Sequence, residues 1–339
     1  MNSRELLDSL RVTLKANHVA FIQGAPGVGK SDIVRQLASK YNLKVIDLRL
    51  SQCDITDLNG FPKISGDKAS YLPMDTFPIC TDSVPVDSNG WLLFLDELNS
   101  ASKSVQAAAY KLILDRMVGQ HKLHDKVFII AAGNRAEDNA VVNDLSTALK
   151  SRMITLQLEP DVESWLDWAN QNGIDFKVSA FIRFKGISGL HKFDPESTDT
   201  AYACPRSWKI LSDLLKCIDE TKIESFEDLF RGTVGTIAIE FLEFCKASKY
   251  LPKLEDVLAG KGSVPPTLGS KSIVVDFLVD KCKSITDNAQ CNNVCEYLKK
   301  FGSEYSVYFY QAAPKKNPKL LQFPAMQEAI KGFASWLRN

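Results

Sequence analysis

Two periodicities divide the first half of the chain. Short, continuous apolar runs are typical of strands that are covered on both faces of a sheet. These runs lie at residues 19–23, 43–50, 91–95, 127–132 and 153–158. Between them, residues 31–41 and 102–117 repeat apolar positions at the spacing of a helix. This alternation of strands and helices predicts a parallel sheet sandwiched by helices.

The pattern changes after Pro160. Helical spacing continues without an evident buried strand, which predicts a second, helical domain. The predicted helices lie near residues 162–169, 176–184, 207–218 and 234–244. From Lys249 onward prolines punctuate the sequence and the pattern weakens. Helices are predicted there near residues 272–282, 291–301 and 325–337.

Composition narrows the class of protein. Lys plus Arg and Asp plus Glu are both 41, so the formal net charge is zero, which argues against coating nucleic acid by bulk charge. No apolar stretch reaches the roughly 18 residues of a membrane-spanning helix, and the charged N-terminus does not resemble a signal peptide. The eight cysteines form no CxxC pair. Even Cys291 and Cys295, four apart, are best interpreted as buried or free thiols, so we expect a reducing, cytoplasmic compartment.

A glycine-rich segment between the first predicted strand and helix carries the most specific chemistry. It fits GxxxxGK[ST] and reads Gly24, Ala25, Pro26, Gly27, Val28, Gly29, Lys30, Ser31. In this context the backbone N–H groups turn inward around phosphates, and the helix N-terminus adds partial positive charge. Lys30 can reach the β- and γ-phosphates, and the Ser31 hydroxyl can ligate Mg²⁺. The alternative, a glycine turn without a ligand, is disfavoured by the flanking strand and helix. The sequence therefore predicts a site for ATP and Mg²⁺.

Two carboxylates end the third apolar run. Asp96 would hold the Mg²⁺ shell, and Glu97 would act as general base for the attacking water. Such a pair means little alone. The pair is stronger evidence when a phosphate loop precedes it in the sequence, because the loop and the carboxylates must then meet at one metal–phosphate centre. A base aimed at water favours an ATPase over a small-molecule kinase.

The order of five motifs resembles the AAA+ superfamily and, within it, the MoxR-type ATPases. The likeness spans most of residues 15–245. It is carried by the phosphate loop and by the segments 96–99 (Asp-Glu-Leu-Asn) with 106–108 (Gln-Ala-Ala), 131–135 (Ala-Ala-Gly-Asn-Arg), 149–152 (Leu-Lys-Ser-Arg) and 204–208 (Cys-Pro-Arg-Ser-Trp). The part beyond Lys249 matches less clearly, and nothing is carried over to it.

The resemblance implies roles for three further residues. Asn134 would orient the attacking water (sensor 1), the alternative being a turn Asn that satisfies its own backbone. Arg152 would reach the neighbouring subunit as an arginine finger, with Lys150 as its competitor and a solvated surface Arg as the plain alternative. Arg206 would reach the γ-phosphate from the lid (sensor 2), the alternative being an exposed first-turn Arg.

The resemblance also implies an architecture. It gives an α/β AAA+ P-loop NTPase core at residues 1–158 with strand order 5-1-4-3-2, a helical lid at 159–248 and a helical C-terminal extension at 249–339. Residues 50–89 and 116–126 take the places of insertions that face a ring pore or a partner. The second would be a hairpin. Its His121 and His124 are spaced for a metal pair but lack a third ligand, so we interpret them as polar hairpin residues.

Three functions remain open at this point. The leading hypothesis is a MoxR-like ATPase, active as a hexameric homo-oligomer, that remodels a protein client and works with a von Willebrand factor A domain partner. The second is a nucleotide-gated assembly scaffold with slow hydrolysis. The third is a nucleic-acid motor. It is disfavoured because neither a winged helix nor a strong basic stripe is visible, and the basic run at 314–319 is interpreted as a solvated loop.

Overall fold

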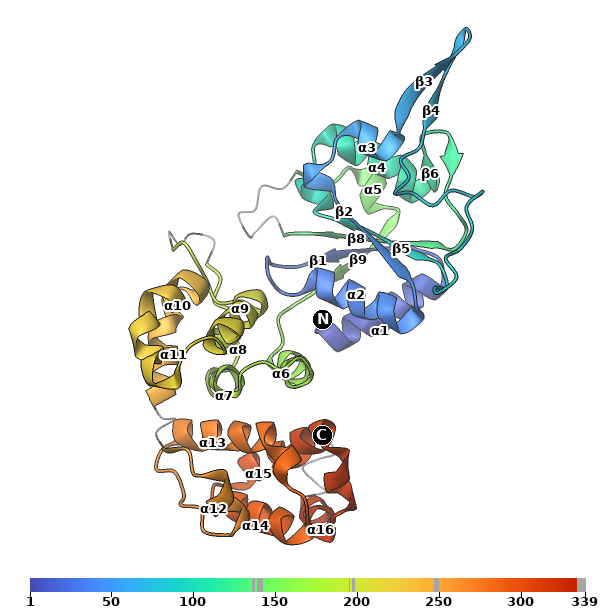
Figure 1. Ribbon diagram of the computed structural model, residues 1–339. Helices are drawn as coiled ribbons and strands as arrows, with labels where there is room; N and C mark the ends of the chain where they lie inside the picture. The colour runs from blue at the N-terminus through green and yellow to red at the C-terminus, as the bar shows by residue number, and fades with distance from the viewer. Residues whose placement is uncertain (136–137, 139–142, 195, 197–198, 247–249, 334–339) are drawn as a thin grey trace. The chain divides into compact units, whose positions relative to one another are not determined.

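The computed structural model describes residues 1–135, 138, 143–194, 196, 199–246 and 250–333 (Figure 1). Two compact units are present: the first comprises mainly Met1–Pro160, and the second begins at Asp161. The boundaries at 158 and 248 that the sequence suggests stay predictions, and residue 248 lies outside the described residues.

A five-stranded parallel sheet forms the centre of the first unit. Its strands are β1 (Val19–Gln23), β2 (Lys44–Arg49), β5 (Trp91–Asp96), β8 (Val127–Gly133) and β9 (Met153–Gln157). They run in the order β2-β5-β8-β1-β9, with every neighbouring pair parallel. This is the order 5-1-4-3-2 expected from the sequence. Because all five strands are parallel, their carboxyl ends meet at one edge of the sheet.

Helices cover both faces of this sheet, which confirms the α/β/α sandwich (Figure 1). Side chains alternate along each strand, so Ala20 and Ile22 pack with α1 (Ser3–Lys15) and α2 (Lys30–Tyr41). The residue between them, Phe21, belongs to the opposite core, with α4 (Lys103–Leu114) and α5 (Thr147–Lys150). The sequence prediction missed α1. Its start is fixed by a capping box in which the Asn2 side chain accepts from the N–H of Glu5 at 3.0 Å and the Glu5 carboxylate accepts from the N–H of Asn2 at 3.0 Å.

The two insertions carry small elements of their own. The first holds a 3₁₀ turn (Leu50–Gln52), α3 (Ile55–Asn59) and an antiparallel hairpin of β3 (Phe61–Ser65) with β4 (Lys68–Leu72), which projects from the first unit in Figure 1. The second is the expected hairpin, of β6 (Met117–Val118) with β7 (His121–Lys122). His121 Nε2 lies 2.9 Å from the Tyr71 carbonyl oxygen, so the second insertion contacts the first.

The described part of the second unit is mainly helical, with one antiparallel bridge between Lys192 and Ala203. Its helices are α6 (Val162–Gln171), α7 (Phe176–Lys185), α8 (Ile187–Leu190), α9 (Pro205–Leu215), α10 (Glu227–Val234), α11 (Ile237–Cys245), α12 (Leu254–Leu258), α13 (Leu268–Asp280), α14 (Asn288–Lys299), α15 (Ser303–Lys316) and α16 (Pro324–Gly332). No described helix of the chain combines the length and apolarity needed to cross a membrane.

The interpretation of the basic run at 314–319 as a loop was wrong, because Asn317 alone in that run lies outside a helix and Pro318–Gln322 forms a 3₁₀ helix. Pro314 to Lys316 form the last turn of α15, a helix that the sequence prediction missed together with α12. Proline ends a helix soon after it appears rather than preventing one upstream. The final predicted helix is present as α16, and residues 334–337 of that prediction lie outside the described residues.

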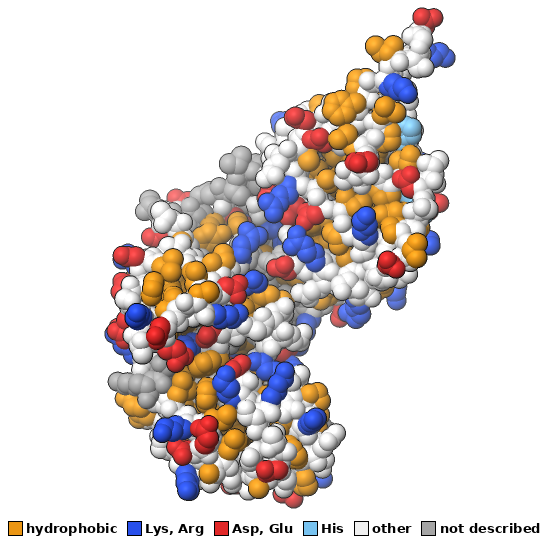
Figure 2. All heavy atoms as spheres, viewed as in Figure 1, with side chains coloured by type: hydrophobic (Ala, Val, Ile, Leu, Met, Phe, Trp, Pro, Cys, Tyr) orange, Lys and Arg blue, Asp and Glu red, His pale blue; other side chains and the backbone are white. Residues whose placement is uncertain are grey.

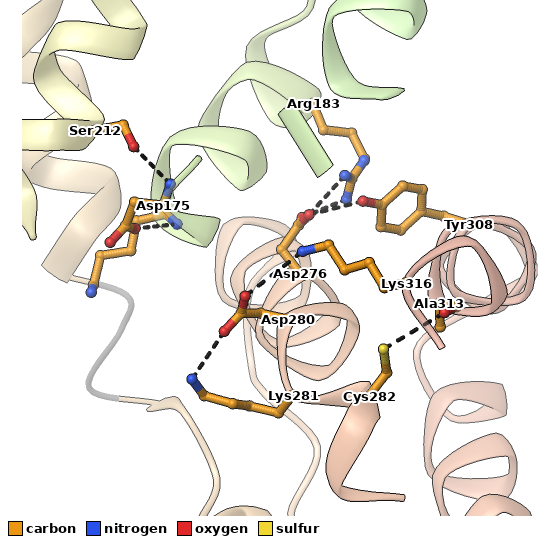
Figure 3. Close-up of polar contacts among 11 residues, drawn as sticks. Asp175, Arg183, Ser212, Asp276, Asp280, Lys281, Cys282, Tyr308, Ala313 and Lys316 are labelled. Carbon is orange, nitrogen blue, oxygen red and sulfur yellow. Dashed lines mark hydrogen bonds and ion pairs between the residues drawn. The ribbon is translucent and has the colours of Figure 1, made fainter. Parts of the chain in front are cut away.

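A buried ion pair joins the helices on either side of residue 249 (Figure 3). Arg183 on α7 forms a two-pronged ion pair with Asp276 on α13, with Nη2 2.8 Å from Oδ1. Tyr308 on α15 donates its hydroxyl to Asp276 Oδ1 at 3.1 Å, and its ring stacks on the guanidinium. Burial raises the pKa of the Asp276 carboxyl, and the adjacent guanidinium opposes that shift. These contacts fix the C-terminal helices against α7.

Candidate active site

The phosphate loop lies at the carboxyl edge of the sheet, between β1 and α2. Gly27 and Gly29 have φ values of 77° and 99°, in the left-handed region that favours glycine. Gly29 is also the N-cap of α2, and a Cβ placed there would have no atom within 4 Å. The motif thus forms the turn between the end of β1 and the first residues of α2. The unpaired N–H groups at the start of a helix are suited to phosphate oxygens.

Lys30 connects the loop to the neighbouring strand. Its side chain is buried, and Nζ donates to the carbonyl oxygens of Gly24 at 2.7 Å and Ala25 at 3.1 Å. The same Nζ lies 2.8 Å from Oδ1 of Asn134, at the end of β8. The structure thus brings together two predicted site residues that are 104 positions apart.

Ser31 and Asp96 meet across the sheet edge. The Ser31 hydroxyl donates to Asp96 Oδ2 at 3.0 Å, although β1 and β5 are separated in the sheet by β8. A hydroxyl and a carboxylate are the hard oxygen donors that Mg²⁺ prefers, and Mg²⁺ commonly takes only one or two carboxylates beside phosphates and water. The residues present therefore fit the magnesium ion that the motif implies.

Glu97 adopts an unusual backbone conformation. Its φ is 56°, in the left-handed region, which for a residue with a side chain costs free energy and is common at functional sites. Its N–H donates to Asp96 Oδ1 at 2.9 Å, and its carboxylate accepts a hydrogen bond from the Ser51 hydroxyl. The turn after β5 is thereby held so that the two adjacent carboxylates point to different partners. Ser51 had not been singled out from the sequence.

Asn99 is a further residue of this edge to which the sequence gave no role. It lies in the 3₁₀ turn Leu98–Ser100 and is 5% exposed. Its Nδ2 donates to the backbone oxygen of Asn134 at 2.7 Å. The sequence signals for Asn99 were its position just after the carboxylate pair and its place in the segment 96–99 that carries the family resemblance.

The two arginines to which the resemblance assigns roles, Arg152 and Arg206, are exposed. Arg152 lies just before β9, and its Nη1 is 2.8 Å from the Ser151 hydroxyl. Arg206 lies in the first turn of α9 in the second unit. Their roles as finger and sensor 2 stay predictions.

Comparison with known proteins agrees with the fold of the first unit. Residues 20–153 match the family model described as AAA domain (dynein-related subfamily). The match begins in β1 and ends in β9, and so contains the phosphate loop, the carboxylate pair and Asn134. It supports an ATP-binding core of the AAA+ type. No protein with a curated description matches the chain.

Solved structures resemble the chain at low sequence identity. A Cytophaga hutchinsonii protein, provisionally named an ATPase, is 14% identical with a TM-score of 0.37, over 83% of this chain and 74% of its own. Two variants of RuvB from Thermotoga maritima are 13% and 14% identical, with TM-scores of 0.37 and 0.39. The first alignment covers 96% of this chain and 84% of that RuvB chain, and the second covers 82% and 81%.

Proposed function

We propose that the protein is a MoxR-type AAA+ ATPase that hydrolyses ATP with Mg²⁺ and uses the cycle to remodel a protein client. The observation that carries this proposal is the convergence of Lys30, Ser31, Asp96 and Asn134 at one edge of the sheet. A phosphate loop that meets an acidic strand end and a polar sensor provides what phosphoryl transfer to water requires.

Each residue takes a part that its position supports. The loop N–H groups and Lys30 bind the phosphates, while Ser31 and Asp96 would hold Mg²⁺, which offsets phosphate charge when bound. Glu97 would accept a proton from the attacking water as the new oxygen–phosphorus bond forms, while the bond from the γ-phosphorus to the β,γ-bridging oxygen breaks and ADP leaves. The Asn134 amide orients that water. Lys30 Nζ donates to Gly24, Ala25 and Asn134 in this structure, so the γ-phosphate would replace one of these three acceptors when ATP binds.

The ring is the part of the proposal that rests on Arg152. In a hexamer of identical subunits this exposed residue would stabilise the charge that develops on the γ-phosphate of the next subunit, and Arg206 would do so from its own lid. The second unit would then move when ATP binds and when it is hydrolysed. We place this cycle in the cytoplasm, with a von Willebrand factor A domain protein as partner.

The β3–β4 hairpin supports the proposal that the first insertion contacts a client or a partner protein. Figure 2 shows apolar side chains along it, and its large exposed apolar residues are Phe61, Ile64, Tyr71 and Leu72, which are 55%, 81%, 42% and 50% exposed. In the hairpin register Phe61 pairs with Leu72, and Pro62 with Tyr71, so Phe61 and Leu72 share one face of the hairpin while Ile64 and Tyr71 share the other. Exposed apolar groups gathered on a projecting element are typical of a binding surface.

A subunit-mixing experiment tests the function and the ring together. The wild-type protein is expected to release phosphate from ATP, and Arg152→Ala to retain ATP binding while its turnover falls at least about tenfold. Lys30→Ala subunits are expected not to bind ATP. Mixing the two variants is expected to restore part of the turnover, because a Lys30→Ala subunit can offer its intact Arg152 to a neighbour that binds ATP.

The matched control is Lys150→Ala, which removes the other exposed cation of this segment and is expected to leave turnover unchanged. An absence of rescue in the mixture would assign Arg152 to its own subunit or to a structural role. An absence of turnover in the wild type would reject the ATPase itself.

A further inference from the structure

We propose that Asn99 is a positioning residue for the reaction, which holds Asn134 in place from the turn that carries the carboxylate pair. The inference rests on the proposed function. It assigns a role to a side chain that touches none of the reacting groups and acts on the water-orienting amide through the backbone.

The first support is the contact itself. Asn99 Nδ2 donates to the backbone oxygen of Asn134 at 2.7 Å, and Asn134 Oδ1 in turn accepts from Lys30. Asn99 therefore holds the main chain of Asn134. The amide side chain of Asn134 stays directed at the phosphate loop. A hydrogen bond in a buried place fixes its acceptor more firmly than one in water.

The second support is the space that the chain keeps for this side chain. A Cβ at Gly133 would lie 2.1 Å from Asn99 Oδ1 and 2.7 Å from its Cγ. Only a glycine before Asn134 lets Asn99 reach its acceptor. Oδ1 is buried and has no hydrogen-bond partner among the described residues, a cost in free energy that the local packing tolerates at this one position.

The third support is the connection of the same turn to the segment before α5. The N–H of Asn143 donates to the backbone oxygen of Asn99 at 2.6 Å, and its side chain donates to the Ala101 oxygen at 2.9 Å. The turn after Glu97 therefore holds both the end of β8 and the chain that leads toward Arg152. Asn99 is the residue common to the two connections.

A double-mutant cycle with Asn134 separates this role from plain stabilisation. Asn99→Ala is expected to lower kcat about 10- to 100-fold, as misplacement of an orienting group does, with ATP affinity changed less than about twofold. It should also lower the melting temperature by about 2–4 °C, the effect of one lost buried hydrogen bond. In an Asn134→Ala background the kcat loss is expected to disappear, since the amide that Asn99 positions is gone.

The melting-temperature loss is expected to persist in that background, because the backbone oxygen that accepts the bond remains after Asn134→Ala. The control is Gln106→Ala, a second buried amide, which donates to Ala101 at 3.2 Å and makes no contact with Asn134. It should lower the melting temperature and leave kcat unchanged. If Asn99→Ala lowers kcat by the same factor with and without Asn134, the positioning role is wrong. Loss of turnover in the wild type would instead reject the proposed function.

Discussion

Replacing Glu97 with glutamine is expected to reduce ATP turnover by about 10²- to 10⁴-fold, the contribution of a positioned general base. Glutamine keeps the size and the hydrogen-bonding oxygen of the side chain but cannot accept the proton of water. ATP affinity should change little, because binding depends on the phosphate loop and on the pair formed by Ser31 and Asp96. Phosphate release at saturating ATP, together with an equilibrium titration, measures both quantities.

Glu255→Gln is the matched control, since it makes the same chemical change at an exposed position on α12. It should turn over ATP like the wild type. Normal phosphate release by Glu97→Gln would remove this residue from the role of base. A bound but uncleaved ATP would also make this variant suited to capturing a client and to measuring the size of the assembly.

Replacing Asp276 with alanine is expected to destabilise the second unit by about 3–5 kcal/mol, the cost of leaving a buried charge without its partner. The Arg183 guanidinium would lose both hydrogen bonds to the carboxylate, and the Tyr308 hydroxyl would lose its acceptor. Urea unfolding of the whole chain, followed by circular dichroism, measures the change in free energy of unfolding.

Asp280→Ala supplies the comparison on the same helix. Asp280 is 35% exposed and pairs with Lys281 at 2.9 Å and with Lys316 at 3.7 Å. A pair that is partly open to solvent contributes about 1 kcal/mol, so this variant should unfold close to the wild type. Equal losses for the two variants would show that the buried pair does not hold α7 and α13 together.

The sequence predicted those parts of the fold that depend on the pattern of neighbouring residues. Parallel strands covered on both faces are continuous apolar runs, so all five were found, and the phosphate loop is specified by glycines that the backbone requires. Helices such as α12 and α15 were missed. The first is short, and the prolines around the second suggested a loop, although Pro314 only ends it.

Contacts between distant residues could not be predicted. Arg183 and Asp276 are 93 positions apart, and nothing in either local sequence indicates the other. Asn99 belongs to the segment 96–99 that carries the resemblance, but that segment assigns it no role. Its role depends on the approach of β8, which places Asn134 within hydrogen-bond distance. Arg152 and Arg206 are the opposite case: their proposed roles come from resemblance, and the fold of one chain does not test them.

The central claim is that Ser31 and Asp96 serve one metal ion that is bound with ATP. Its most direct test is the equilibrium affinity for ATP, with Mg²⁺ and with a chelator, of the wild type, Ser31→Ala, Asp96→Asn and the double variant. The account predicts that Mg²⁺ tightens binding to the wild type, that each single variant loses most of this gain, and that the double variant loses little more. Independent, additive losses, or a gain that survives both substitutions, would contradict it.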